Sequence, residues 1–464
     1  MTDVRHDILK GLAWNPAAPN GVLLRLLSPE ASSAWFWLCL RPDPPAEVVD
    51  AMINHPDFRV RGSIAESWNA DPADRARLVD DPEPKVRMAL ASGPEPFRME
   101  VAPLPDAAYQ RLLSDPDKEV RYWAVRSRSI PARILAGYAD HADPAVRVAV
   151  CRVWDGLAPA TREALLADPD TEVRRAAALR ACVDDGALTD ELLDTLDKWP
   201  RADVLMKGRL TRATAERLVA SEDSGERYAV ASNPSLPPDL VTGLASDPEH
   251  HVRLAISLRP GLTEDKRAAV DYRVDPKDRS GPVRWVWNLG AHDIDVLRRC
   301  ATSGHVLLRR SAAANRHLPV DLVGPLAHDE DFAVRLLTCE YQPSAPADAL
   351  LRMVLEWSGY TRADMLARPQ FPRQGLAGYA DDEDPAVRML AVYDPGASPE
   401  LIERLSRDES TGVRYTAAGD PRLTLARIEE LLTESDTAQA AAGNPALPVA
   451  VMHRLLDETV PRPQ

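Results

Sequence analysis

The sequence predicts an all-α solenoid, and three observations support this fold class: a phrase that recurs at a fixed interval, apolar stripes at helical spacing, and prolines placed where helices start and stop. The phrase is Asp-Pro-x-x-x-Val-Arg, followed by small residues and then Asn-Pro or a relative, and it recurs along most of the 464 residues. A period of about 20 to 50 residues is the signature of stacked repeats. We therefore expect an array of about 17 short two-helix repeats of roughly 26 residues each.

The arginine of this phrase sets the register of the repeats. Successive arginines are 26, 34, 26, 27, 53, 26, 31, 25, 26, 53 and 26 residues apart. Each interval of 53 contains a degenerate copy near its midpoint, at Arg201 and at Arg362. Extrapolation places Trp35 and Ala438 in the same slot, with a further copy around Leu9. The repeated arginines are Arg61, Arg87, Arg121, Arg147, Arg174, Arg227, Arg253, Arg284, Arg309, Arg335, Arg388 and Arg414.

Each repeat is predicted to contain two short helices. An aspartate six residues before most of these arginines, often followed by proline as in Asp115-Pro116, is the expected N-cap of the first helix. That helix ends at pairs such as Asn233-Pro234, because a residue before proline is pushed out of the α region. The second helix carries Leu and Val at three- and four-residue spacing, which gives it one apolar stripe. Since isolated helices this short are unstable in water, stacked neighbours must bury the stripes.

The full repeat unit, Asp-Pro-x-x-x-Val-Arg-x-x-x-Ala-x-Asn-Pro-x-Leu-Pro-x-x-Leu-Leu-x-x-Leu, resembles the leucine-rich repeat variant family. It is more loosely similar to HEAT-like repeats, which share the Asp and Arg ladder. Residues 222–253 match closely through Ser232-Asn-Pro-Ser-Leu-Pro237. The resemblance spans most of the chain and implies a right-handed superhelix that binds a partner. The N-terminal cysteine cluster that holds an iron–sulfur centre in a known relative has no counterpart in this sequence.

We predict one continuous array over residues 1–464, with capping repeats at 1–45 and a C-terminal cap at 438–464. The aromatic residues Trp14, Trp35, Phe36 and Trp37 are expected to seal the N-terminal end, because terminal repeats must cover an open core. Two intervals exceed the period, and their extra residues at 94–105 and 272–282 are expected to form loops. Such loops either line a binding face or are tolerated surface insertions.

The residues that usually carry catalysis or bind metals follow the repeat instead of forming a unique cluster. Cys39, Cys151 and Cys339 stand four residues after the repeat slot, where other repeats have Ala or Val, so we expect buried, inert thiols. The five cysteines have no disulfide, zinc or iron–sulfur spacing, and the ten histidines have no ligand spacing. No nucleotide-binding or hydrolase motif occurs. The sequence therefore predicts no catalytic residue, metal or cofactor, and the Asp and Arg ladder is interpreted as a packing device.

A basic stretch at residues 253–317 is the candidate binding region. It holds 13 Lys and Arg residues against 7 Asp and Glu, whereas the whole chain has a net charge of −15. Clustered arginines beside aromatic rings suit carboxylate or phosphate groups on a partner, although ordinary solvated charge is the alternative. The candidate partner-binding residues are Trp285, Trp287, Arg298, Arg299, Arg309, Arg310 and Arg316.

The leading functional hypothesis is a cytoplasmic, non-catalytic scaffold that holds a protein or peptide, including one with acidic groups, on its concave surface. The chain begins without a secretory signal pattern, and its strongest apolar run, Ala34–Leu40, is far shorter than the roughly 20 residues that cross a bilayer. A small-molecule-binding or enzymatic solenoid with a pocket beside an insertion loop stays open. Nucleic-acid binding, or HEAT-like DNA glycosylase chemistry at Trp154 and Asp155, is disfavoured because the chain is acidic overall.

Overall fold

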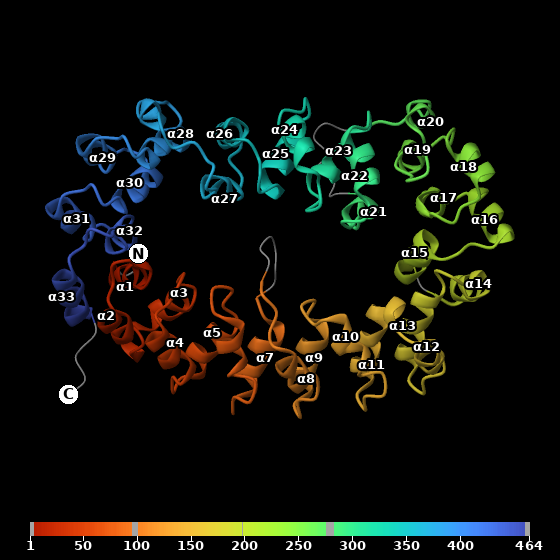
Figure 1. The fold of residues 1–464 in the computed structure, drawn as a ribbon, viewed down its shortest axis with the longest axis horizontal. Helices are drawn as coiled ribbons and strands as arrows, with labels where there is room; N and C mark the ends of the chain where they lie inside the picture. The colour runs from red at the N-terminus through yellow and green to blue at the C-terminus, as the bar shows by residue number, and fades with distance from the viewer. Residues whose placement is uncertain (1–3, 95–100, 197, 275–282, 460–464) are drawn as a thin grey trace. The chain divides into compact units, whose positions relative to one another are not determined.

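A computed structural model describes residues 4–94, 101–196, 198–274 and 283–459 of the chain. Throughout these ranges the regular secondary structure is helical, and the segments between helices contain no strand. Short helices alternate between two rows along the chain (Figure 1). This confirms the prediction of an all-α solenoid built from pairs of short helices.

We name the helices at the repeat slot the ladder helices, and the described chain has one for each predicted repeat. At both ends of the chain these are α1 (Val4–Trp14), α3 (Trp35–Cys39), α5 (Phe58–Ala65), α7 (Pro84–Ser92), α9 (Lys118–Arg126), α11 (Pro144–Val150), α28 (Pro385–Arg388), α30 (Thr411–Ala418) and α32 (Ala438–Ala442). Between them lie α13 (Thr171–Ala181), α15 (Lys198–Lys207), α17 (Ser224–Ser232), α19 (His250–Ser257), α21 (Arg284–Trp287), α23 (Val306–Ala313), α25 (Phe332–Tyr341) and α27 (Arg362–Leu366).

The second helices of the repeats often begin after a proline, which supplies a fixed φ at the helix start. They are α2 (Asn20–Arg25), α4 (Ala46–Ile53), α6 (Pro72–Ala76), α8 (Asp106–Leu113), α10 (Ala132–Ala136), α12 (Pro159–Leu166), α14 (Gly186–Thr195), α16 (Arg212–Val219), α18 (Pro238–Leu244), α20 (Glu264–Ala268), α22 (Ile294–Ala301), α24 (Val320–Ala327), α26 (Ala347–Glu356), η3 (Leu376–Tyr379), α29 (Pro399–Leu405), α31 (Leu425–Leu431) and α33 (Val449–Thr459). Short 3-10 segments flank three ladder helices: η1 (Pro29–Ala34), η2 (Cys151–Gly156) and η4 (Met389–Tyr393).

The helices group into two compact units. Unit 1 contains residues 1–156 together with 373–464, and unit 2 contains residues 157–372. Within unit 1 the ladder helices α1, α3, α30 and α32 lie on the inner side of the curved stack, and the second helices α2, α4, α29, α31 and α33 lie on its outer side (Figure 1). The single continuous array over 1–464 stays a prediction, and most of the two predicted loop insertions, at 95–100 and 275–282, lies outside the described residues.

The core runs between repeats, and no repeat has a core of its own. The residue before the ladder arginine is fully buried in repeat after repeat, as at Val60, Val120, Val173 and Val252. In unit 2 one buried apolar cluster extends from Cys182 to Val270, across several successive repeats. Burial of this kind stabilises each helix pair only through its neighbours, as expected for a solenoid.

The ladder arginines join consecutive repeats by ion pairs. Arg87 donates from Nε to Asp115 at 2.7 Å and from a terminal nitrogen to the Asp81 carbonyl at 2.6 Å, so it contacts its own repeat and the next one. The same geometry recurs in the pairs Arg61–Asp81, Arg227–Asp247, Arg309–Asp329 and Arg388–Asp408. The structural interpretation of the ladder is confirmed for these residues. Arg284 is an exception, since it is exposed on α21.

The predicted N-cap was placed two residues too early. The aspartate six residues before the arginine binds the preceding repeat's arginine, and Asp115 also accepts a hydrogen bond from the Asp117 backbone N–H at 2.8 Å. The cap itself is four residues before the arginine: the Asp117 carboxylate accepts from the Glu119 backbone N–H at 2.8 Å. The same N-cap position is taken by Asp57, Asp143, Asp170, Asp223, Asp331 and Asp384. Two aspartates therefore have separate roles, one binding an arginine and one capping the helix, whereas the sequence interpretation assigned helix capping to the first.

A second set of polar side chains connects repeats at the carboxyl ends of several ladder helices. Asn233 donates its side-chain amide to the Leu205 and Gly208 carbonyls, and Asn444 donates to the Ala418 and Asp420 carbonyls. These side chains satisfy carbonyl groups that the helix end leaves without an intrahelical partner. Because Asn233 and Asn444 are fully buried, their hydrogen bonds are structural links and not surface features.

Candidate functional site

The ladder helices of unit 1 present a solvent face that the fold does not use. Residues one, two and five positions after the repeat slot lie on the same side of an α-helix, opposite the buried positions. Several of these residues are aromatic and exposed, with 41 to 57% of their surface accessible in Trp14, Phe36, Tyr122, Trp123 and Tyr415. Large exposed apolar side chains gathered on one face are characteristic of interaction surfaces.

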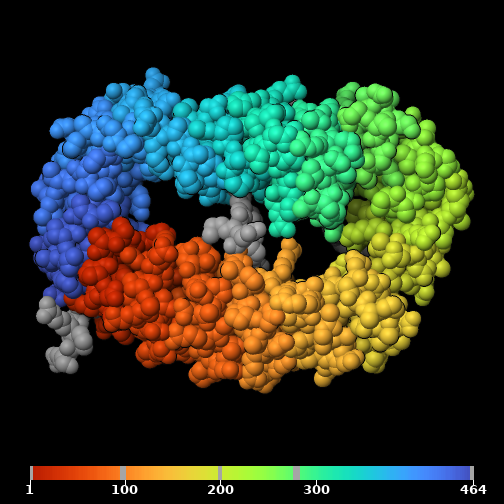
Figure 2. Space-filling model, in the orientation of Figure 1, coloured from red at the N-terminus to blue at the C-terminus, as the bar shows by residue number. Residues whose placement is uncertain are grey.

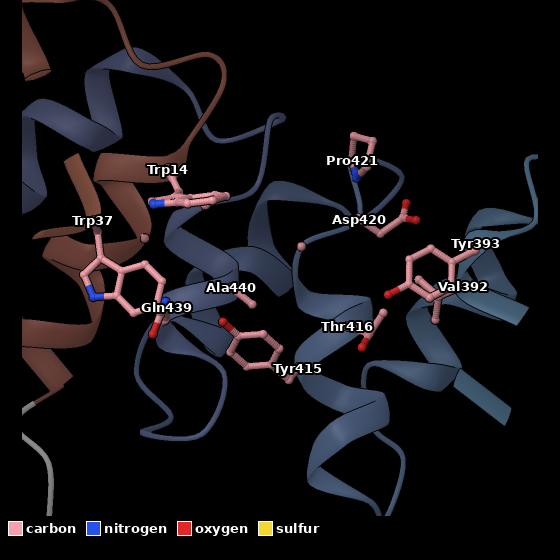
Figure 3. Close-up of a pocket in the computed structure, with 13 residues that line it drawn as sticks. Trp14, Trp37, Val392, Tyr393, Tyr415, Thr416, Asp420, Pro421, Gln439 and Ala440 are labelled. Carbon is pink, nitrogen blue, oxygen red and sulfur yellow. The ribbon is translucent and has the colours of Figure 1, made fainter. Parts of the chain in front are cut away.

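An open cleft of about 580 Å³ lies on this face, where the first repeats of the chain meet the last. Trp14 and Trp37 come from the N-terminal end, while Tyr393, Tyr415 and Gln439 come from the C-terminal end (Figure 3). The Trp14 and Trp37 rings meet edge to face, with centroids 6.1 Å apart. Volumes of about 300 to 1,000 Å³ are usual for ligand sites. We name this site, which belongs entirely to unit 1, the junction cleft.

The junction cleft offers hydrogen-bond donors as well as aromatic surface. Within the described residues, the indole N–H groups of Trp14 and Trp37, the Tyr415 hydroxyl and the Gln439 side-chain amide make no hydrogen bond. Burial of the ring, and then the negative charge of Asp7, raises the pKa of Tyr415, so its hydroxyl stays protonated at neutral pH. A ligand with carbonyl oxygens would therefore find several donors in one place.

The carboxylate that lines the cleft is already neutralised. Asp420 is 8% exposed and pairs with Arg422 at 2.6 Å. The same guanidinium also donates to the Val392 and Asp394 carbonyls, which holds it beneath the cleft surface. The other residues that line the cleft are uncharged, so the cleft has aromatic walls and little net charge.

The cleft depends on a tight contact between the two ends of the chain. Helix α1 packs on α32, and the red and blue ends of unit 1 touch directly in Figure 2. A Cβ at Gly11 would lie 2.2 Å from the Gln439 carbonyl oxygen, so only glycine allows this approach. Asn15 donates to the Ala442 and Asn444 carbonyls at 2.8 Å, as Asn444 does to its own preceding repeat.

The first repeat therefore continues the stack of the last repeat by the same chemistry that joins consecutive repeats. Arg25 and Asp457 add an ion pair of 2.8 Å between α2 and α33. The sequence interpretation gave Trp14, Trp35, Phe36 and Trp37 to an end cap. The structure buries Trp35 and places Trp14 and Trp37 in the wall of the junction cleft.

Three of the arginines predicted to bind a partner in the basic stretch pair with carboxylates of the chain. Arg310 is 3% exposed and binds both carboxylate oxygens of Asp331 at 2.8 Å. Burial alone would raise the pKa of Asp331, but the Arg310 guanidinium and the Val334 N–H lower it on balance. Arg309 is a ladder arginine paired with Asp329 at 2.8 Å. Arg298 pairs with Asp321 at 2.5 Å on the surface.

The other four predicted residues divide between packing and exposure. Trp285 is half-buried and donates its indole N–H to the Leu258 carbonyl at 2.9 Å. Trp287 is 45% exposed and meets Tyr341 edge to face at 5.7 Å. Arg299 and Arg316 are exposed, and Arg316 contacts its neighbour His317. Arg309 and Arg310 are therefore held by carboxylates within the fold, and partner binding by the seven residues stays a prediction.

Ser257 and His305 form a buried serine–histidine pair in unit 2. Ser257 Oγ lies 3.0 Å from His305 Nε2, but both residues are fully buried. His305 Nδ1 accepts a hydrogen bond from the Leu307 backbone N–H, so Nε2 carries the proton and donates it to the serine. Ser257 donates in turn to the Leu254 carbonyl at 2.7 Å. The pair caps helix α23, and its histidine is the wrong tautomer to act as a base toward the serine.

All five cysteines are buried and free, and Cys39, Cys151 and Cys339 were predicted to be buried. Burial raises the pKa of Cys39 to about 12. Trp154 is buried whereas Asp155 is exposed, so the pair considered for glycosylase chemistry does not share a surface. In the described part of the chain, no three His, Cys, Asp or Glu residues gather as a metal ion would require.

Comparison with solved structures gives distant likenesses, two of which are described below. No protein-family model matches the chain, and no curated protein sequence matches it. A crystal structure of the karyopherin Kap121p, bound to the extreme C-terminus of the protein phosphatase Cdc14p, is 13% identical with a TM-score of 0.20. The alignment covers 94% of this chain and 51% of the karyopherin, so the chain spans about half the length of that protein.

The second likeness is to an engineered protein of known crystal structure. It is 17% identical, with a TM-score of 0.13, and the alignment covers 96% of this chain and 95% of that one. At these TM-scores neither likeness informs what the chain binds. As for membrane association, every helix in the described ranges is too short or too polar to cross a bilayer. The helix pairs and the links between them identify the chain as an α-helical repeat protein.

Proposed function

We propose that this protein is a non-catalytic scaffold that holds a protein or peptide segment on the solvent face of its ladder helices. We also propose that its repeats are of the leucine-rich repeat variant type. The observation that carries the functional proposal is the set of exposed aromatic rings on the solvent side of the ladder helices α1, α3, α9 and α30. The fold does not need these rings, because its core is built from the Val, Leu and Ala residues on the opposite side.

Aromatic side chains are effective contacts because they bury a large area and lose little conformational entropy. In α9, Tyr122 and Trp123 lie side by side with centroids 5.7 Å apart, and the Arg126 guanidinium stands over the Tyr122 ring at 5.3 Å. A partner segment that crosses several repeats would meet exposed rings on α1, α3, α9 and α30. Affinity would then come from many moderate contacts, with the rings as anchors.

For a partner with acidic groups, the basic stretch of unit 2 offers two accessible contacts. Arg299 is exposed, and Trp287 presents nearly half of its surface. Arg309 and Arg310 would have to leave carboxylate partners before they could bind a new one. We therefore assign the acidic-partner contact to Trp287 and Arg299. The free, buried thiols are compatible with the reducing cytoplasm, which is the location we propose.

Affinity purification from the native host, read by mass spectrometry, tests the proposal. One bait variant combines Tyr122→Ala with Trp123→Ala. The matched control is Leu425→Ala, because this side chain is similarly exposed, at 41%, but lies on α31 and not on a ladder helix. We expect the double variant to lose the partner while the control retains it, with equal thermal stability for both. Full partner recovery by the double variant would contradict binding on the ladder-helix face.

A small-molecule panel provides the second arm. A metabolite that raises the thermal midpoint of the wild type, in the absence of any protein partner, would favour the alternative of a small-molecule-binding solenoid. The scaffold proposal expects no such shift, because its contacts are spread over a long surface.

A further inference from the structure

We propose that the junction cleft binds an extended, proline-rich peptide segment, and that it does so only while the two chain ends are joined. This inference rests on the proposed peptide-binding function and names the site and the class of partner. The cleft exists because residues more than 400 positions apart in the sequence, such as Trp14 and Tyr415, form facing parts of one surface.

The shape and chemistry of the cleft match a polyproline helix. Proline-rich segments dock in grooves lined by aromatic rings, because proline rings pack flat on them and the extended chain loses little entropy. Trp14, Trp37, Tyr393 and Tyr415 supply such rings around the cleft (Figure 3). Each large ring is only partly covered, so a ligand would remove apolar surface from water.

The hydrogen-bonding groups of the cleft select the same ligand. Proline has no backbone N–H, so a proline-rich segment presents carbonyl acceptors and few donors. The cleft presents two donor side chains, the Gln439 amide and the Tyr415 hydroxyl, beside the faces of the two indole rings. Amide N–H and phenol O–H groups that donate to carbonyl oxygens would fix the position of the segment along the cleft.

Charge excludes the competing classes of peptide. The carboxylate of Asp420 is held by Arg422, so the cleft has no free charge to attract a basic or an acidic segment. Asp7, beside Tyr415, is 8% exposed and pairs with Lys10 at 2.9 Å. An uncharged segment with carbonyl acceptors is the complement of this lining.

Binding at the cleft is linked to the contact between the chain ends. If α1 separates from α32, Trp14 and Trp37 move away from Tyr415 and Gln439, and the site ceases to exist. A ligand that binds only the joined state must stabilise that state, by thermodynamic linkage. Asn15 reports this coupling cleanly, because it holds the junction through Ala442 and Asn444 but does not line the cleft.

Fluorescence polarisation with labelled decaproline tests the site in the full-length protein. A Gly-Ser decapeptide, a basic decapeptide and an acidic decapeptide are the comparison probes. We expect decaproline to bind at least about tenfold more tightly than any of them. The proposal fails if the four peptides bind equally or if decaproline does not bind.

Variants then assign the binding to the cleft. Trp14→Ala and Trp37→Ala should each weaken decaproline binding about tenfold or more, because aromatic anchors dominate such contacts. Tyr415→Phe should weaken it about two- to tenfold, the usual effect of losing one hydrogen bond. Trp68→Ala is the control, since that ring is 46% exposed but lies outside the cleft. Equal losses in Trp68→Ala and Trp14→Ala would overturn the assignment.

Hydrogen exchange tests the coupling. Asn15→Ala and, as a stronger variant, Gly11→Val should speed amide exchange in α1 and α32 and weaken decaproline binding, while saturating decaproline should slow the same exchange in the wild type. Faster exchange with unchanged affinity, or unchanged exchange in both variants, would overturn the coupling. If these tests fail but Tyr122→Ala with Trp123→Ala still loses the host partner, the scaffold proposal stands and only the cleft inference falls.

Discussion

The junction cleft of unit 1 and the basic stretch of unit 2 bring candidate binding residues together in opposite ways. In residues 253–317 the candidates are close in sequence, yet Arg309 and Arg310 are occupied by Asp329 and Asp331. In the junction cleft, Trp14 and Tyr415 are far apart in sequence, yet they line one open surface. In a solenoid, neighbours in sequence occupy successive layers, so local composition predicts a surface poorly.

The difference shows that a residue's role follows its position within the repeat. At the repeat slot an arginine such as Arg87 links layers, whereas side chains one or two positions after the slot face solvent in α3, α9 and α30. Arg310 directly follows the ladder arginine Arg309, but its guanidinium binds Asp331, which also caps α25. The predictions below test this distinction by comparing matched residues of the two regions.

The largest effect is expected for Arg310→Ala. Removing the guanidinium leaves the Asp331 carboxylate, which is largely buried, without its partner, and breaking such a buried pair costs about 3 to 5 kcal/mol. Arg299→Ala, at an exposed site of the same stretch, should change stability by less than about 0.5 kcal/mol. Urea denaturation measures both. Equal stabilities of the two variants would mean that the Arg310–Asp331 ion pair does not stabilise the fold, and Arg310 would again be a candidate partner contact.

Acid should weaken unit 2 at His305. Burial, and then the positive charge of Arg267, lowers the pKa of His305 from 6.5 to about 4, although Glu264 opposes this shift. The folded state thus binds its proton at lower pH than the unfolded state does. Stability is fully present above pH 6.5 and is lost as the pH falls toward 4, by about 3 kcal/mol in total.

The control for this pH dependence is His305→Asn, because asparagine keeps an N-cap acceptor without a titrating ring. We expect the wild type to lose more stability than the variant between pH 7 and pH 4, measured by urea denaturation at each pH. Unfolding can be followed at each pH by the circular dichroism of the backbone. Identical pH profiles would show that the ladder carboxylates, and not His305, determine the acid sensitivity.

Gly11→Val should produce an intermediate effect confined to unit 1. The added side chain cannot fit against the Gln439 carbonyl without displacing α1 from α32, and overpacking of this kind costs about 1 to 3 kcal/mol. Gly21→Val is the control, since no atom lies within 4 Å of a Cβ at that position. Hydrogen exchange should show faster opening of α1 and α32 only in the first variant. Equal protection in both would mean that the chain ends are not held by this contact.

Much of the fold is predictable from the sequence because the repeat states it many times. The period, the buried Val60 and Val120 before their arginines, and the buried Cys39 all follow from comparing equivalent slots. The N-cap was misplaced because Asp115 and Asp117 are both acidic, and only the geometry shows that the first binds an arginine and the second caps the helix.

The junction cleft was beyond sequence reasoning for a physical reason. It forms where helices from the two ends of the chain meet, and no single repeat specifies that contact. Gly11 gives a first hint of a close helix contact, since glycine inside a helix costs about 1 kcal/mol relative to alanine. Asn15 offered a second hint, because it matches Asn233 and Asn444, which bind a preceding repeat. A first repeat needs such a residue only if another repeat stands before it.

The smallest stability effect, and the sharpest comparison, is expected for Trp14→Ala against Trp287→Ala. The two rings are similarly exposed, at 41% and 45%, and each has an edge-to-face aromatic partner, at 6.1 Å and 5.7 Å. Each substitution should therefore cost about 1 kcal/mol, the usual value of such a pair. Their binding should differ: Trp14→Ala should lose decaproline, whereas Trp287→Ala should lose only an acidic partner. Because the two rings have similar exposure and their loss should cost similar stability, binding is the property that distinguishes them. If Trp287→Ala lost decaproline binding and Trp14→Ala did not, the decaproline site would lie in the basic stretch and not in the junction cleft.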